Sequence, residues 1–330
     1  MRGLFMAFWL GCILLVAPAC SRFTSEPYST STDPAALMRL IRPEWQLEGA
    51  AATVERNVPD TDVSAPPETE IRSLRPVLIT PLSTTRLLMI VSGRPVSVND
   101  PPDTERSTPA RLDAYWFGKR GNRWYRIGEH LDFALAGFHG EPGILKTTEL
   151  DTRRKALAIE NGRCRQGRCG RWLNLFAIDL VRITPLFPDG EPIHIAAETE
   201  TPSGRCKEML KMRAGTRDNM ALDEFSPRSG CYAISNTWYL TPGKDAPGDL
   251  TVNLQGTRVT ARRITLDPDE KALDQVIEDA IAHGENCCAQ PYQPTEAYLA
   301  TVNAVNAQLS FRFEDGHYVP ANKRDPLPAF

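Results

Sequence analysis

The stretch Leu-Thr-Val-Asn-Leu-Gln at residues 250–255 alternates apolar and polar side chains without interruption. Successive side chains of a β-strand point to opposite faces, so this period of two predicts a strand with one buried face. Two further stretches repeat the pattern, with apolar members Tyr232, Ile234, Trp238 and Leu240 in one and Trp172, Phe176, Ile178 and Leu180 in the other. The sequence therefore predicts a mainly β protein whose antiparallel sheet forms a sandwich-like or barrel-like domain.

Turn residues between such stretches predict β-hairpins. Asp315-Gly316 separates an alternating run ending at Phe313 from Tyr318, and Gly accepts the positive φ that a tight turn requires. A second hairpin is expected from Ala114 to Ile127, with its turn at residues 118–122. The 27 prolines are about 8% of the chain against a usual ~5%, which favours many short elements joined by turns.

Helical periodicity is expected late in the chain, as an insertion over residues 268–308. Five apolar residues fall on one helical face, namely Leu273, Val276, Ile277, Ala280 and Ile281. Asp267, Pro268 and Glu270 are typical of a capped start, which explains the acidic residues there, Asp269 included, better than acid–base chemistry does. A second helix is predicted after Pro294, from the spacing of Tyr298, Val302, Val305 and Leu309.

The N-terminus has the layout of a secretory signal peptide over residues 1–19. Arg2 precedes an apolar run from Leu4 to Val16, which ends in small residues before Cys20. A membrane-spanning helix needs roughly 20 apolar residues, and this run is shorter. We therefore expect an exported protein.

Small residues followed by Cys20 resemble the lipobox of bacterial lipoproteins, although Ala17 stands where that family prefers Leu, and Pro18 where a small residue is commoner. The resemblance implies that Cys20 becomes the first residue of the mature chain and carries acyl chains, palmitate among them. These chains would anchor the protein to the periplasmic face of a membrane. Ser21 resembles the sorting residue of outer-membrane lipoproteins. Ala17-x-Ala19 also suits the ordinary signal peptidase, so both cleavage sites remain open.

Residues 20–76 are expected to be a tether with one short helix at residues 34–41. The segment is Ser/Thr-rich at its start and contains Pro66-Pro67, so the globular domain is placed at residues 77–330. The formal net charge is −3, and removal of Arg2 with the signal would make it −4. A nucleic-acid partner is not expected, because such a protein would carry a basic excess.

Six of the eight cysteines remain after Cys12 and Cys20 are set aside, and an even number in an exported chain favours disulfides. Cys164 and Cys169 enclose four residues including Gly167, which suits a hairpin bridge. Cys206 and Cys231 lie beside glycines at the two ends of one connection, so we predict that they pair. Cys287 and Cys288 are left either as a vicinal disulfide or as thiols.

The body of the chain resembles uncharacterised β-rich secreted proteins of Gram-negative bacteria. The motifs that carry the resemblance are the hairpin from Trp116 to Trp124, Gln166-Gly167 before Leu173-Asn174-Leu175, Gly204-x-Cys206 with Cys231-Tyr232, and Phe313-x-Asp315-Gly316-x-Tyr318. The resemblance implies secretion and a β fold, and it brings no catalytic residues.

Standard catalytic signatures such as G-x-S-x-G and H-E-x-x-H are missing from the sequence. The five histidines are widely separated, so neither a metal nor a cofactor is expected. One aromatic cluster offers sugar-stacking surfaces, although cross-strand aromatics more often fill a sheet core; its members are Tyr115, Trp116, Phe117, Trp124 and Tyr125. No catalytic residue is assigned.

Four arginines surround the Cys164–Cys169 loop, namely Arg163, Arg165, Arg168 and Arg171. They favour a contact loop, because guanidinium groups pair with carboxylates and phosphates and a closed loop loses less entropy on binding; a solvated hairpin tip is the alternative. The sequence thus favours a periplasmic binding or inhibitor protein, similar to immunity lipoproteins. The alternatives are a cell-envelope enzyme acting on peptidoglycan and a structural envelope lipoprotein.

Overall fold

A computed structural model describes residues 26–45, 52–58, 68–95, 108–221, 230–244, 246–266, 295–321 and 327–328 of the chain. This part is mainly β, its sheets are antiparallel, and only two α-helices occur in it, which confirms the predicted fold class. No helix there is long and apolar enough to cross a membrane.

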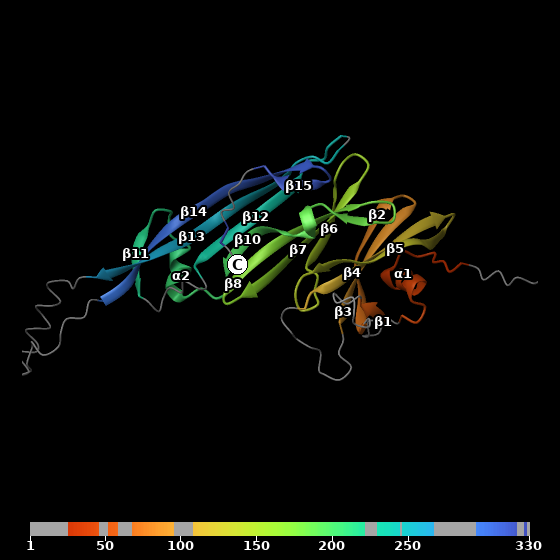
Figure 1. Ribbon diagram of the computed structural model, residues 1–330, viewed down its shortest axis with the longest axis horizontal. Helices are drawn as coiled ribbons and strands as arrows, with labels where there is room; N and C mark the ends of the chain where they lie inside the picture. The colour runs from red at the N-terminus through yellow and green to blue at the C-terminus, as the bar shows by residue number, and fades with distance from the viewer. Residues whose placement is uncertain are drawn as a thin grey trace, which may run out of the picture.

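A five-stranded meander forms the N-terminal sheet (Figure 1). Its strands are β1 (Ala52–Val58), β2 (Glu68–Ser83), β3 (Arg86–Pro95), β4 (Ala110–Arg120) and β5 (Arg123–Ala136), in that order across the sheet. The turn between β4 and β5 falls at Gly121-Asn122, so the hairpin predicted over residues 114–127 is confirmed.

A ten-stranded sheet holds the rest of the strands. They are β6 (Ile144–Glu149), β7 (Lys155–Arg165), β8 (Arg168–Ile178), β9 (Ile183–Pro185), β10 (Ile193–Thr199), β11 (Arg217–Ala221), β12 (Tyr232–Leu240), β13 (Leu250–Leu266), β14 (Thr295–Glu314) and β15 (His317–Pro320). The order is β11-β14-β13-β12-β10-β8-β7-β6, with β15 paired to β14 and β9 to β8. The sheet is therefore open and not a closed barrel.

The two sheets pack face to face through buried side chains of both. Trp116 of β4 and Leu88 of β3 meet Leu157 of β7 and Phe176 of β8 in this layer, and each is 5% exposed or less. On the outer face of the five-stranded sheet lies helix α1 (Pro34–Ile41), whose Leu37 is fully buried. Helix α1, the five-stranded sheet and the larger sheet thus form three successive layers.

The folded part begins before residue 77, where the globular domain was expected to start. The short helix expected at residues 34–41 is present as α1, but Leu37 and Met38 pack on the sheet instead of lying in a free tether. Strand β2 also begins at Glu68 and pairs with β1. The low apolar content of residues 53–76 gave no sign of these strands in the sequence.

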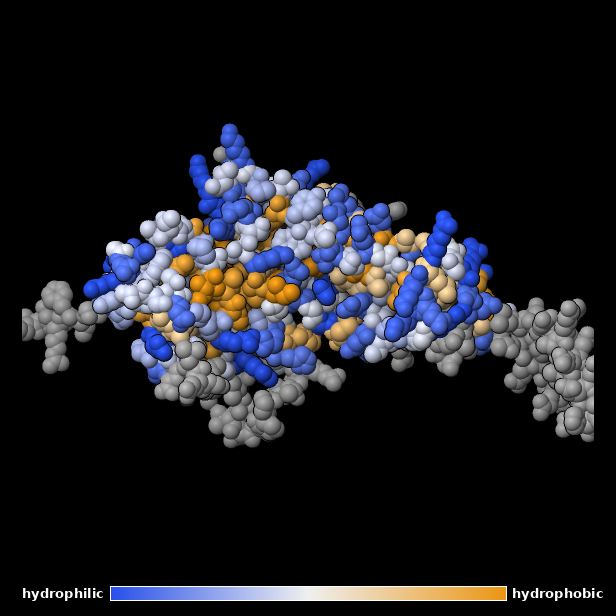
Figure 2. Space-filling view, turned by 180° about the vertical axis from the view of Figure 1, so that it is seen from behind, coloured by the Kyte–Doolittle hydropathy of each residue, from blue (hydrophilic) through white to orange (hydrophobic). Residues whose placement is uncertain are grey.

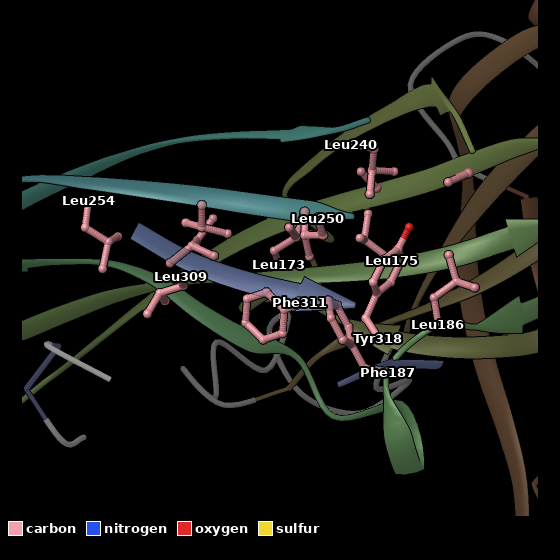
Figure 3. Close-up of a cluster of buried hydrophobic side chains, with 14 of the residues drawn as sticks. Leu173, Leu175, Leu186, Phe187, Leu240, Leu250, Leu254, Leu309, Phe311 and Tyr318 are labelled. Atoms are coloured by element: carbon pink, nitrogen blue, oxygen red, sulfur yellow. The ribbon is translucent and has the colours of Figure 1, made fainter. Parts of the chain in front are cut away.

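The larger sheet buries one face around its own core (Figure 3). Leu250, Val252 and Leu254 all point into it, as their alternation predicted. Leu186, Phe187 and Tyr318 cover this core, and the Tyr318 hydroxyl donates a hydrogen bond to the Gly248 carbonyl at 2.8 Å. The turn between β14 and β15 lies at Asp315-Gly316, where it was expected.

Strand β8 differs from its predicted one-faced alternation because both of its faces are buried. Leu173 and Leu175 point into the core of the larger sheet, whereas Phe176 and Ile178 point between the sheets. Leu180 lies beyond the strand and is 65% exposed. A strand between two cores is continuously apolar, and its period is not visible in the sequence.

The helix predicted after Pro294 is wrong, since Thr295–Glu314 is strand β14. It pairs with β13 continuously from Leu266 to Leu250. The two halves of β14 bury opposite faces: Val302 packs beside the short helix α2 (Gly204–Met209), whereas Leu309 points into the core of the larger sheet. This change of face produced the helix-like spacing. The helix predicted over residues 268–284 falls outside the described residues.

Candidate functional site

Strands β7 and β8 form a hairpin closed by the two-residue turn Gln166-Gly167. Both residues have positive φ, 52° and 77°, as the favoured hairpin turns require. Cys164 and Cys169 face each other directly across the strands at disulfide distance, with Cα atoms 4.0 Å apart. The predicted hairpin is confirmed, and this cysteine pair holds its end.

The hairpin brings three of the four arginines to one face. Arg165 is paired with Arg168 across the turn, and Arg163 lies two residues before Arg165, so these three share a face. Arg171 is paired with Gly162 and points to the opposite face. Arg163 and Arg165 are exposed and Arg168 is half-buried. The predicted cluster of four is therefore a cluster of three with one arginine behind it.

Arg163 lies over an aromatic surface at the base of the hairpin tip. Its guanidinium carbon is 5.1 Å from the ring centre of Trp172 and 5.9 Å from that of Phe138. Trp172 in turn stacks on His194 of β10, with ring centres 5.2 Å apart and an angle of 19°. Cation–π contacts of this kind hold a guanidinium in place while its N–H groups stay available.

Gly170 makes room for this stack. A Cβ at residue 170 would lie 2.4 Å from the Trp172 ring and 3.0 Å from His194 Nε2. The indole consequently lies flat against the strand. A glycine inside a strand is a recognised sign of such a close approach, and it was the one signal in the sequence that pointed to Trp172.

A groove of about 330 Å³ begins at this aromatic surface. It lies where the end of β5 approaches the larger sheet, and Leu135, Phe138, Arg163, Trp172 and Pro192 are among the residues that line it. Leu135 is 57% exposed although it is apolar. The hairpin thus presents guanidinium groups beside an apolar and aromatic groove.

Arg171 belongs to a second polar cluster centred on Glu160. The Glu160 carboxylate accepts hydrogen bonds from Lys146 Nζ at 2.7 Å and from Trp238 Nε1 at 2.8 Å. Burial acts to raise the pKa of Glu160, but the bonds from Lys146 and Trp238, with the charges of Lys146 and Arg171, outweigh it and lower that pKa. Glu160 is therefore a structural anion that ties β6, β7 and β12 together.

A possible metal site at the hairpin is occupied by the disulfide. Cys164, Cys169 and the Glu200 carboxylate offer donor atoms within 4.8 Å of one another, the one such group of three in the described part. The two sulfur atoms are bonded to each other, so no thiolate is available to a metal. These residues do not fit a zinc site, which takes four ligands.

Of the other cysteines assigned from the sequence, Cys206 and Cys231 are also at disulfide distance, with Cα atoms 5.8 Å apart. This pair joins α2 to the start of β12, and both residues are buried. Cys20, Cys287 and Cys288 fall outside the described residues.

The aromatic cluster considered for sugar binding lies mostly in the core. Tyr115, Trp116 and Phe117 are at most 1% exposed, and Trp124 is 7% exposed. Tyr125 is half-buried against Tyr28, with ring centres 5.9 Å apart. Trp172, which is half-buried, offers an aromatic surface outside this cluster.

No protein-family model, curated protein or solved structure matches this chain.

Proposed function

We propose that this chain is a lipid-anchored periplasmic binding protein of the inhibitor or immunity type, which contacts its partner through the tip of the β7–β8 hairpin. The observation that carries the proposal is the closed tip with Arg163, Arg165 and Arg168 on one face beside the Trp172 groove. The arginines supply charge, and the groove supplies apolar contact.

The covalent closure favours recognition. A tip that already has its bound conformation loses little entropy on binding, so more of the contact energy appears as affinity. Arginine and tryptophan are also the residues that most often carry the energy of protein interfaces. The partner surface that fits the tip has exposed carboxylates next to an aliphatic or aromatic side chain.

The test begins with a photo-reactive residue at Gln166 in cells, followed by purification of the cross-linked envelope protein. Arg165→Ala/Arg168→Ala should then weaken binding to that protein by about tenfold or more and flatten its salt dependence. Arg171→Ala is the matched control, because Arg171 lies on the same hairpin but on the opposite face.

Three outcomes separate the candidate functions. Loss of affinity with the double variant alone supports the binding protein. Equal affinity of all variants means that the tip is only a solvated hairpin, and the proposal fails. Release of soluble fragments from purified peptidoglycan by the wild-type chain would indicate the envelope enzyme in its place.

A further inference from the structure

The turn that joins β8 to β9 exposes two aliphatic side chains at its tip. Leu180 is 65% exposed and Val181 50%. The turn is closed by a hydrogen bond from the Asp179 backbone N–H to the Arg182 carbonyl at 2.9 Å. Tight turns favour Gly, Asn, Asp and Ser, so an adjacent Leu-Val pair here needs an explanation beyond turn formation.

Cations surround this tip. A hollow of about 590 Å³ is lined by the apolar residues Leu82, Ile178, Leu180 and Val181 and by Arg86, Arg153, Arg154, Lys155 and Arg182, with Asp179 as its one acid. Arg154 pairs with Asp151 and Lys155 with Glu149. The remaining three arginines form no ion pair with any carboxylate in the described part of the chain. They are therefore available to an external anion.

The turn is held in place by the edge of the five-stranded sheet. Val181 packs so closely on β5 that a Cβ at Gly128 would lie 2.7 Å from its Cγ1 atom. The backbone N–H of Ile183 donates a hydrogen bond to His130 Nδ1 at 3.2 Å. The exposed side chains thus stand on a fixed support and not on a free loop.

The N-terminal segment reaches the fold at the same end of the five-stranded sheet. Ser29 forms a backbone bridge with Trp124, next to the β4–β5 turn. Lys119, before that turn, donates its backbone N–H to the carbonyl of Thr85, the neighbour of Arg86 in the chain. Glu26, the first residue described, forms an ion pair with Arg120 of β4 at 3.3 Å, next to the same turn.

Tyrosines and arginines accompany the N-terminal segment there. The Arg123 guanidinium lies 4.1 Å from the ring centre of Tyr28, and that of Arg120 lies 5.2 Å from the ring centre of Tyr125. Amphipathic aromatics with adjacent cations are typical of protein surfaces at the membrane–water interface. Figure 2 shows apolar surface next to hydrophilic surface over the region of the five-stranded sheet.

We infer that this end of the molecule docks on an anionic phospholipid membrane, with Leu180 and Val181 entering the headgroup region and Arg86, Arg153 and Arg182 contacting lipid phosphates. Aliphatic side chains gain free energy by leaving water, and each cation gains from the negative surface potential. The docking does not require a lipid on Cys20 and is independent of the partner proposed for the hairpin.

The combination of contacts favours a membrane over a free phosphate ion. A small hydrated anion gains from the three arginines, but it removes almost no aliphatic surface from water. A lipid surface satisfies both features of the site, since phosphates lie directly above the acyl boundary into which short apolar residues insert.

The test measures partitioning of the full chain carrying Cys20→Ser onto vesicles of phosphatidylcholine alone or with about 30% phosphatidylglycerol. The charge variant is Arg153→Gln/Arg182→Gln, and the apolar variant is Leu180→Ser. The control is Arg213→Gln/Arg262→Gln, because these two exposed arginines lie away from the hollow, near β11 and in β13. Every variant has the same N-terminal segment, so differences between them report on the folded part. Circular dichroism confirms that each variant is folded.

We expect the double charge change to weaken binding to anionic vesicles by about 30-fold, since each surface cation contributes about fivefold. Leu180→Ser should weaken it by roughly tenfold, and the control by less than about twofold. Equal partitioning of all variants overturns the inference. Saturable binding of inorganic phosphate with no effect of Leu180→Ser also overturns it, because the hollow would then be an anion site.

Discussion

The two disulfides close chain loops of very different length, and this predicts unequal contributions to stability. Cys206 and Cys231 are 25 residues apart in the sequence, whereas Cys164 and Cys169 are 5 apart. A cross-link stabilises mainly by reducing the entropy of the unfolded chain, and its effect rises with the logarithm of loop length. The perturbation is the removal of each bridge in turn by a pair of Cys→Ala substitutions.

The loop-entropy relation gives about 3.5 kcal/mol for the 25-residue loop and about 2 kcal/mol for the 5-residue loop at 25 °C. The difference, about 1.4 kcal/mol, depends only on the ratio of the two lengths. Packing increases it, because Cys206 is 3% and Cys231 1% exposed in the cluster under α2, whereas in the hairpin pair Cys169 is buried and Cys164 is exposed. The hairpin bridge should therefore act mainly on its own tip.

Urea unfolding of the two variants and of the wild-type chain measures the difference in stability through the transition midpoint. The dependence of the free energy of unfolding on urea concentration shows whether the unfolded state has changed. Hydrogen exchange of the hairpin amides should rise in Cys164→Ala/Cys169→Ala while global stability falls little. A larger loss of stability from the hairpin pair than from Cys206→Ala/Cys231→Ala would refute the reasoning. It would mean that the tip contributes to the core and not only to its own order.

Three further predictions follow from single groups. Cys20→Ser should release the protein into the soluble fraction when membranes are washed at high salt, which screens the arginine contacts with lipid, and an unchanged pellet after that wash would argue against lipidation. Arg72, which is 1% exposed, pairs at 2.5 Å with Asp132, whose side chain is 33% exposed, and the Asp132 backbone N–H donates a hydrogen bond to the buried Asp113 carboxylate. Arg72→Met should lower the free energy of unfolding by about 3 kcal/mol in urea, and a loss below about 1 kcal/mol would show that water compensates the remaining carboxylates. The pKa of His130 lies below its usual 6.5, first through burial and then through the charge of Arg182. Folding therefore favours the neutral imidazole. The stability that this preference provides is fully present above pH 6.5 and is lost as the pH falls through the lowered pKa. His130→Gln should remove that part of the pH dependence of the thermal midpoint, and an unchanged profile would exclude this role.

Signals that act over a few residues could be predicted from the sequence. The alternation of Leu250, Val252 and Leu254, the turn at Asp315-Gly316 and the hairpin around Gln166-Gly167 depend on backbone geometry within one strand or turn. Such features do not depend on what packs above the sheet, so the β class and the position of the arginine tip were both predictable.

Features that depend on distant partners could not be predicted in this way. Strand β14 buries Val302 on one face and Leu309 on the other because α2 covers only its first half. The contacts of the candidate site could not be predicted for the same reason. Trp172 stacks on His194, and Trp238 donates a hydrogen bond to Glu160, and each contact joins two strands that are separated in the sequence. A single period along the chain contains no information about which neighbour covers each half of a strand.

The length of the β7–β8 hairpin explains how one small domain could serve both a membrane and a partner. Lys155 and Ile178, paired at its base, line the cationic hollow, and Arg165 and Arg168 form its tip. Ten residue steps at ~3.3 Å separate the two by about 33 Å. That distance is about four Debye lengths at physiological salt, so a docked membrane would exert almost no attraction on the tip arginines. Membrane docking at the base and protein contact at the tip would therefore act independently of each other.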